Sequence, residues 1–181
     1  TGIDGVGKTC LAIALAHHLL HTARTAAIFK DGIFFVSLED SHAEATSLAA
    51  LAGDLRLAVS DRGRSLLAQI EDYLAERRCL LILDGVQPQQ ASVEFVAALV
   101  AKAPGLSVLM TSAQEIGLAD EATFPLGGLD ISAIDFFDDT SLDFPACRLF
   151  LEHTAGSTQP FTTPDVIKSV IKICQMVEGI P

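Results

Sequence analysis

Three short apolar runs most constrain the fold of this 181-residue chain. They cover residues 33–38, 79–84 and 106–111, and aliphatic or β-branched residues dominate each of them. Runs of this length are typical of buried strands and are too short for buried helices. Longer stretches with helical spacing of apolar residues separate them. This alternation predicts an α/β fold, with a parallel sheet that is covered by helices on both faces.

The helical stretches follow from apolar residues that recur every three or four positions. Leu11, Leu15 and Leu19 show this spacing near the start of the chain. We expect helices at about residues 9–21, 43–55, 64–78, 91–103, 146–154 and 163–179.

A weaker apolar segment at residues 123–126 suggests one further strand.

Residues 2–9 read G-I-D-G-V-G-K-T, a complete G-x-x-x-x-G-K-T phosphate loop. Its glycines can adopt positive φ and bring backbone N–H groups close to an anion. The N-terminus of the helix that follows adds a partial positive charge, which also favours an anion. Lys8 would place a charge against the β- and γ-phosphates, and the Thr9 hydroxyl would be a magnesium ligand. The alternative is a glycine-rich turn that precedes a lysine by chance.

Asp84 directly follows five apolar residues of the second predicted strand. Its carboxylate would therefore lie at the carboxyl end of a buried strand, where open α/β sheets bind ligands. This position fits a Walker B aspartate that holds magnesium through water. By itself the residue would equally suit a turn or a helix cap. The phosphate loop upstream favours the magnesium interpretation.

Composition excludes some classes of function. The net charge is −11, from 23 acidic and 12 basic residues, which argues against a nucleic-acid surface on this segment. No apolar run reaches the ~18 residues of a membrane span, and no signal peptide is evident. The four cysteines are far apart and form no C-x-x-C pair, so neither a zinc site nor a disulfide framework is expected. We expect a reducing, cytoplasmic setting.

Taken together, these segments resemble the NTPase module of the STAND class, the NB-ARC-like ATPases of bacterial multidomain regulators. The matching pieces are residues 2–9, 32–38, 79–84, 106–112, 125–129, 147–152 and 173–181.

The resemblance implies an ASCE-type P-loop NTPase sheet, followed by the start of a small helical domain. The implied boundaries are 1–129 for the nucleotide-binding domain, 130–145 for an acidic linker and 146–181 for the helical domain. A strand normally precedes a phosphate loop, so the resemblance also implies that the first strand is missing and that the helical domain is truncated.

The resemblance also implies a site for ATP or ADP with Mg²⁺. Residues 179–181 would be its G-x-P element, with Pro181 against the adenine. The metal ligands would be Thr9 and Asp84, and the catalytic residues Lys8, Asp84 and Thr111. The cofactor-binding residues would be Gly2, Asp4, Gly5, Val6, Gly7, Lys8, Thr9, Cys10 and Pro181.

Two departures from the family pattern predict weak ATPase activity at most. Gly85 stands where relatives often have an acidic residue or Asn, and Ala113 stands where they commonly have an arginine. Loss of a cation at the γ-phosphate removes transition-state stabilisation. Binding should survive, because Lys8, Thr9 and Asp84 remain.

The expected function is therefore an ATP/ADP-dependent regulatory switch in a signalling or transcription-regulating STAND ATPase. The alternatives are an active ATPase that drives remodelling and a scaffold that binds proteins but no nucleotide. The expected partners are an adenine nucleotide, fused sensor or effector domains, other proteins and a nucleotide-dependent oligomer. Neither a membrane nor nucleic acid is expected to bind this segment.

Overall fold

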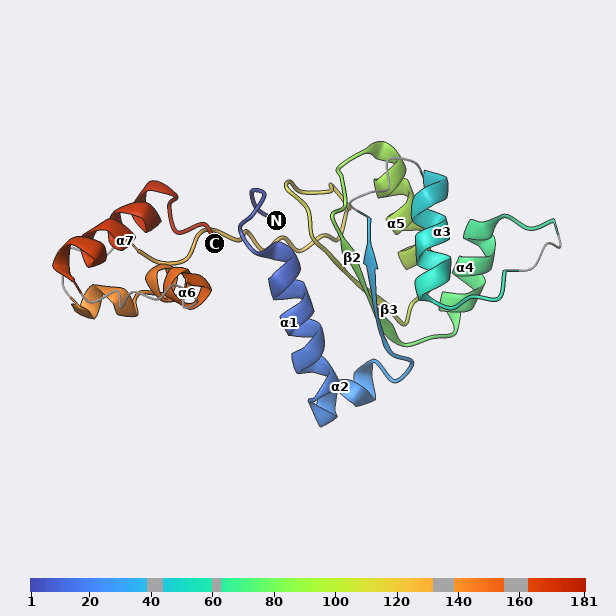
Figure 1. Cartoon of the computed structure of the whole chain (residues 1–181). Coiled ribbons are helices and arrows are strands. Elements are labelled where there is room, and N and C mark those ends of the chain that lie inside the picture. Colours follow the sequence, from blue (N-terminus) through green and yellow to red (C-terminus); the bar gives the residue numbers. More distant parts are fainter. Residues whose placement is uncertain (39–43, 60–62, 132–138, 155–162) are drawn as a thin grey trace. The chain divides into compact units, whose positions relative to one another are not determined.

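The computed structural model describes residues 1–38, 44–59, 63–131, 139–154 and 163–181 (Figure 1). The chain divides into two compact units. The first comprises Thr1 and Lys8–Phe124, and the second comprises Gly2–Gly7 and Pro125–Pro181. The elements are α1 (Lys8–Leu20), α2 (Ala23–Ile28), β1 (Ile33–Ser37), α3 (Glu44–Asp54), α4 (Leu66–Ala75), β2 (Cys79–Asp84), α5 (Gln90–Lys102), β3 (Leu106–Met110), the 3₁₀ helix η1 (Asp139–Asp143), α6 (Pro145–Thr154) and α7 (Pro164–Met176).

The first unit is built on a parallel sheet of three strands in the order β1-β2-β3. Every residue of the central strand β2 is buried. Side chains alternate between the two faces of a strand, and β2 uses both faces. Leu81 and Leu83 belong to a core with α3, α4 and α5, whereas Leu80 and Ile82 pack with α1 (Figure 1). Helices thus flank the sheet on both faces, which confirms the α/β fold class.

Most of the expected elements are present within a few residues of their predicted ends. Residues 123–126 are the exception, because they form no strand. Phe124 is 71% exposed, so this segment lacks the burial that a sheet strand would have. The short helix α2 was not predicted, because its segment shows no clear apolar period.

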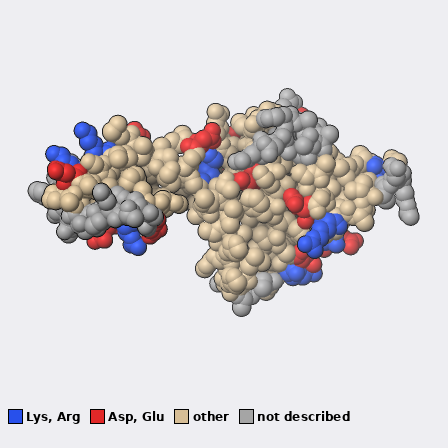
Figure 2. Space-filling view, in the orientation of Figure 1, with Lys and Arg blue, Asp and Glu red and all other residues tan. Residues whose placement is uncertain are grey.

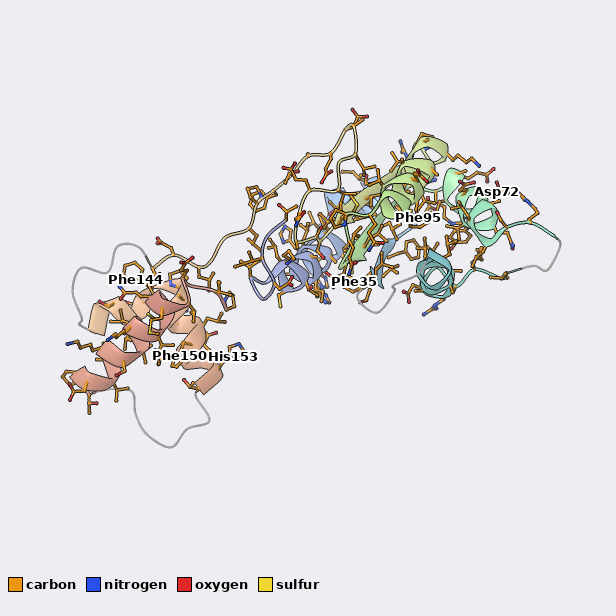
Figure 3. The ribbon with its side chains drawn as sticks, turned by 90° about the horizontal axis from the view of Figure 1, so that it is seen from above. Phe35, Asp72, Phe95, Phe144, Phe150 and His153 are labelled. Carbon is orange, nitrogen blue, oxygen red and sulfur yellow. The ribbon has the colours of Figure 1, made fainter. Side chains whose placement is uncertain are left out.

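The second unit has a small helical core of its own. Its buried residues are Ala146, Cys147, Ile167, Val170, Ile171 and Cys174, which come from α6 and α7. Phe144 and Phe150 pack against this cluster (Figure 3). Leu129 and Leu142 also pack there, so parts of segment 130–145 and its neighbours contribute to this core. Residues 132–138 of the expected acidic linker lie outside the described residues.

Charged residues are sparse over α1 in the view of Figure 2. Leu11, Ile13, Leu15 and Leu20 of α1 are all exposed, whereas Leu19 packs against the sheet. None of the helices that the structure describes combines the length and the apolar character needed to cross a bilayer.

Candidate functional site

Asp84 is the last residue of β2 and the centre of a polar cluster in the first unit. The parallel register pairs it with Ser37, the last residue of β1. Its backbone carbonyl accepts a hydrogen bond from the N–H of Leu38 at 2.8 Å. The residue is only 2% exposed. A buried carboxylate must be hydrogen-bonded or paired with a cation, because its desolvation is costly.

The Thr9 hydroxyl supplies one of these hydrogen bonds. Its Oγ1 lies 2.8 Å from Oδ1 and 3.0 Å from Oδ2 of Asp84. Thr9 is the second residue of α1, so this contact joins the first turn of the helix to the carboxyl end of β2. The two residues are 75 positions apart in the sequence. The structure thus brings together both residues that were predicted as magnesium ligands.

Thr111 supplies the second hydrogen bond to the carboxylate. Its hydroxyl donates to Asp84 Oδ1 at 2.6 Å and accepts from the Gly85 N–H at 2.9 Å. The backbone completes the arrangement, because the Val86 N–H donates to the Thr111 carbonyl at 2.9 Å. Thr111 therefore fixes the position of the Asp84 carboxylate.

The backbone conformation of Gly85 was not predicted from the sequence. The sequence indicated only that this position lacks a carboxylate. In the structure its φ is +79°, a conformation that side chains other than glycine rarely adopt. This conformation accompanies the hydrogen bond from its N–H to Thr111. The Asp-Gly pair directly after an apolar run was the available signal.

Lys8 and Cys10 flank Thr9 at the start of α1. Lys8 is the first residue of the helix, and Cys10 is an exposed residue in its first turn. Lys8 joins the glycine loop covalently through its peptide bond to Gly7.

The loop Gly2–Gly7 belongs to the second unit. Gly5 and Gly7 have φ values of +82° and +96°, and these support the predicted glycine-dependent turn. Gly2 has a φ of +157°, near extended backbone, but a Cβ there would meet the Leu126 carbonyl oxygen.

The remaining predicted binding residues of this unit surround that turn. Asp4 is exposed and Val6 is buried. A Cβ added to Gly7 would lie 4.0 Å from Cγ of Pro181. Pro181 and the loop are therefore near each other within the second unit.

The donor set of the Asp84 cluster fits a magnesium ion. Thr9 and Asp84 offer hydroxyl and carboxylate oxygens, which are the hard ligands that Mg²⁺ prefers. Among the described residues, no group of three or more His, Cys, Asp or Glu could hold a metal. An ion at Asp84 would thus have few protein ligands and would keep water or phosphate oxygens, as Mg²⁺ commonly does.

No known family model matches the chain. It is similar to proteins of Mycobacterium bovis and Mycobacterium tuberculosis that carry the provisional name HTH-type transcriptional regulator, with 29% identity over 183 aligned positions and 99% of this chain. The chain spans only 18% of the length of those relatives. It is also similar to an uncharacterized protein of M. tuberculosis, with 26% identity over the whole chain and 42% of the relative.

These relatives correct the expected function. They are named as transcriptional regulators and not as STAND ATPases, so the expectation of an ATP/ADP switch in a STAND ATPase is wrong. The descriptions of the protein as NB-ARC and STAND are wrong for the same reason, and the names of the relatives give no evidence of ATP binding. The resemblance depended on short motifs, and a phosphate loop is shared by proteins of many different functions. Such motifs describe a local site and do not specify the protein that contains it.

Proposed function

We propose that this chain is part of a transcriptional regulator, and that its first unit binds magnesium and the phosphates of a nucleotide. The names of the relatives support the first half of the proposal. The single observation that carries the second half is the buried Asp84 carboxylate, hydrogen-bonded to the Thr9 hydroxyl at the first turn of α1.

The position of Thr9 relative to Asp84 gives each residue a role in this proposal. Thr9 Oγ1 has lone pairs that can bind a cation while its hydroxyl proton stays hydrogen-bonded to Asp84. Bound Mg²⁺ would neutralise phosphate charge. The Asp84 carboxylate would hold the water ligands of the ion. Thr111 would keep that carboxylate in place through its 2.6 Å hydrogen bond.

The start of α1 supplies the positive potential that phosphates require. The first N–H groups of a helix have no partners within the helix, and the helix dipole adds partial positive charge at this end. Lys8 is the first residue of α1 and adds a full charge. The parallel sheet, the helices on both its faces and the preceding G-x-x-x-x-G-K-T sequence support a P-loop NTPase fold as part of this proposal. ATP or ADP is the proposed nucleotide.

Calorimetric titration of the chain with Mg-ATP and Mg-ADP tests the proposal. Lys8→Ala should weaken binding on the order of ten- to a hundredfold, because a charge-assisted contact contributes about 1.5–3 kcal/mol. Lys30→Ala is the matched control, since Lys30 is 59% exposed and its nearest ion-pair contact is with Asp31 at 4.0 Å. Equal affinity in Lys8→Ala and Lys30→Ala, or no binding to the wild type, would contradict the proposal.

A second titration tests how nucleotide binding depends on magnesium. Removing magnesium with a chelator should weaken nucleotide binding by the wild type. It should change the nucleotide affinity of Asp84→Asn little, because this variant lacks the carboxylate. Asp72→Asn is the control, because the Asp72 side chain is 58% exposed and pairs with Arg64 on the surface. Melting curves of each variant show whether it is folded.

A further inference from the structure

The second unit places two of the four cysteines against each other. Cys147 in α6 is completely buried, and Cys174 in α7 is 3% exposed. Both belong to the same apolar cluster, and the Cys174 thiol lies close enough to raise the pKa of Cys147. Residues 27 positions apart (174 − 147) therefore form a dithiol pair that the sequence spacing did not reveal.

We propose that Cys147 and Cys174 are a redox modification site, at which a low-molecular-weight disulfide such as oxidised glutathione converts the two thiols to a disulfide bond. The bond would join α6 to α7. It requires the sulfur atoms to approach to about 2.05 Å. Because both side chains already pack in one buried cluster of α6 and α7, we expect the bond to form with small movements of the two helices.

The chemistry proceeds in two thiol–disulfide exchanges. The Cys174 thiolate attacks one sulfur of the reagent, which breaks the reagent's S–S bond and releases one glutathione thiolate. The Cys147 thiolate then attacks the Cys174 sulfur and releases the second glutathione. Two protons leave the protein, and its two electrons reduce the reagent. Cys174 is the first nucleophile because it is the more exposed of the pair.

The environment of the pair makes this reaction slow and dependent on pH. Burial and the neighbouring Cys174 thiol raise the pKa of Cys147 to about 11. Few Cys147 thiols are therefore ionised near neutral pH. The second exchange, which needs the Cys147 thiolate, should become faster as the pH rises.

The other two cysteines lack this arrangement. Cys10 is exposed on α1. Cys79 is buried in the core of the first unit, where burial and the charge of Asp31 raise the pKa of its thiol. Neither belongs to the cluster of α6 and α7. Oxidation of Cys10 should thus yield glutathione adducts or disulfides between chains.

The test is to incubate the folded chain with oxidised glutathione, block the remaining thiols and measure the masses of its peptides. We expect a cross-linked Cys147–Cys174 peptide that is about 2 Da lighter than the two reduced peptides together, with neither cysteine blocked. Cys79→Ala should still give this product, and Cys174→Ala should not. The oxidised wild type should also melt at a higher temperature than the reduced protein, because the bond restricts the unfolded chain.

The same experiment in guanidinium chloride provides the comparison with the unfolded chain. The native chain should favour Cys147–Cys174 over the other pairings of four cysteines, whereas the unfolded chain should lose that preference. The proposal is overturned if the native chain keeps both thiols reduced, retains a glutathione adduct on Cys174, or shows the same distribution of pairings as the unfolded chain. The melting comparison uses the wild type alone, so a variant that fails to fold does not affect it.

Discussion

The Thr111 hydroxyl donates a 2.6 Å hydrogen bond to Oδ1 of Asp84, across the carboxyl ends of two neighbouring strands. The same hydroxyl accepts from the Gly85 N–H. Thr111 is 6% exposed and Asp84 is 2% exposed, so water can replace neither contact without a structural change. This hydroxyl therefore satisfies a buried acceptor and a backbone donor at once.

Thr111→Val should lower the free energy of unfolding by about 1–3 kcal/mol, because it leaves Asp84 without one donor and Gly85 without its acceptor. Urea unfolding measures the change. Thr111→Ser should retain most of the stability, because serine keeps the hydroxyl. Thr123→Val is the control at an exposed position and should stay within about 0.5 kcal/mol of the wild type. A valine variant as stable as the serine variant would show that the hydroxyl is dispensable.

Lys102→Met should destabilise the first unit more than Arg64→Met does. The Lys102 ammonium pairs with Glu71, whose side chain is 6% exposed, and this pair joins α4 to α5. Removing the lysine leaves a buried carboxylate without its cation, which we expect to cost about 1–2 kcal/mol, since Lys102 itself is largely exposed. Arg64 pairs with Asp72 on the surface, and such pairs contribute about 0–1 kcal/mol.

A double-mutant cycle separates this ion pair from other effects of Lys102, such as its place in the last turn of α5. Glu71→Gln combined with Lys102→Met should cost less than the sum of the single changes in urea unfolding. Strict additivity would mean that the pair contributes nothing.

The sheet was predictable from the sequence because its strands are short apolar runs between helical segments. Asp84 was predictable for a related reason, since a carboxylate after a fully apolar strand must lie at a strand end. Thr9 followed from the phosphate-loop pattern. Each of these features depends on residues that are neighbours in the sequence.

Contacts between distant segments could not be predicted in this way. The hydrogen bond from Thr111 to Asp84 depends on the register of β2 and β3. The pairing of Cys147 with Cys174 depends on how α6 packs on α7. Neither packing arrangement leaves a periodic signal in the sequence. A local motif also could not predict how the relatives are named.

Glu121 should make stability depend on pH in the acid range. Burial raises the pKa of its carboxyl, but hydrogen bonds from the N–H groups of Ile116, Gly117 and Leu118, together with the charge of the N-terminal amine, outweigh that effect. The pKa therefore lies below its usual value of 4.5. A lowered pKa in the folded state contributes stability at pH values above the unfolded value. That contribution is lost as the pH falls through the folded value.

The melting temperature of Glu121→Gln should therefore fall less than that of the wild type between about pH 5 and pH 3. Thermal melting across this range measures the difference. Glu115→Gln changes an exposed carboxylate in a neighbouring part of the same loop and should follow the wild-type curve. If the three proteins show the same pH dependence, the hydrogen bonds to Glu121 do not favour its ionised form.

Gly179→Ala should destabilise the second unit by more than about 1 kcal/mol, because Gly179 has a φ of +69° and a Cβ there would collide with the Leu129 carbonyl oxygen. The chain cannot easily move away, since the Leu129 N–H donates to the Gly179 carbonyl at 2.8 Å. Gly127→Ala is the matched control in the same unit, with open space around the added methyl and no positive φ. Limited proteolysis within 125–181 and thermal melting should show earlier unfolding for Gly179→Ala and little change for Gly127→Ala. Equal resistance in the two variants would contradict the close backbone contact between Leu129 and Gly179.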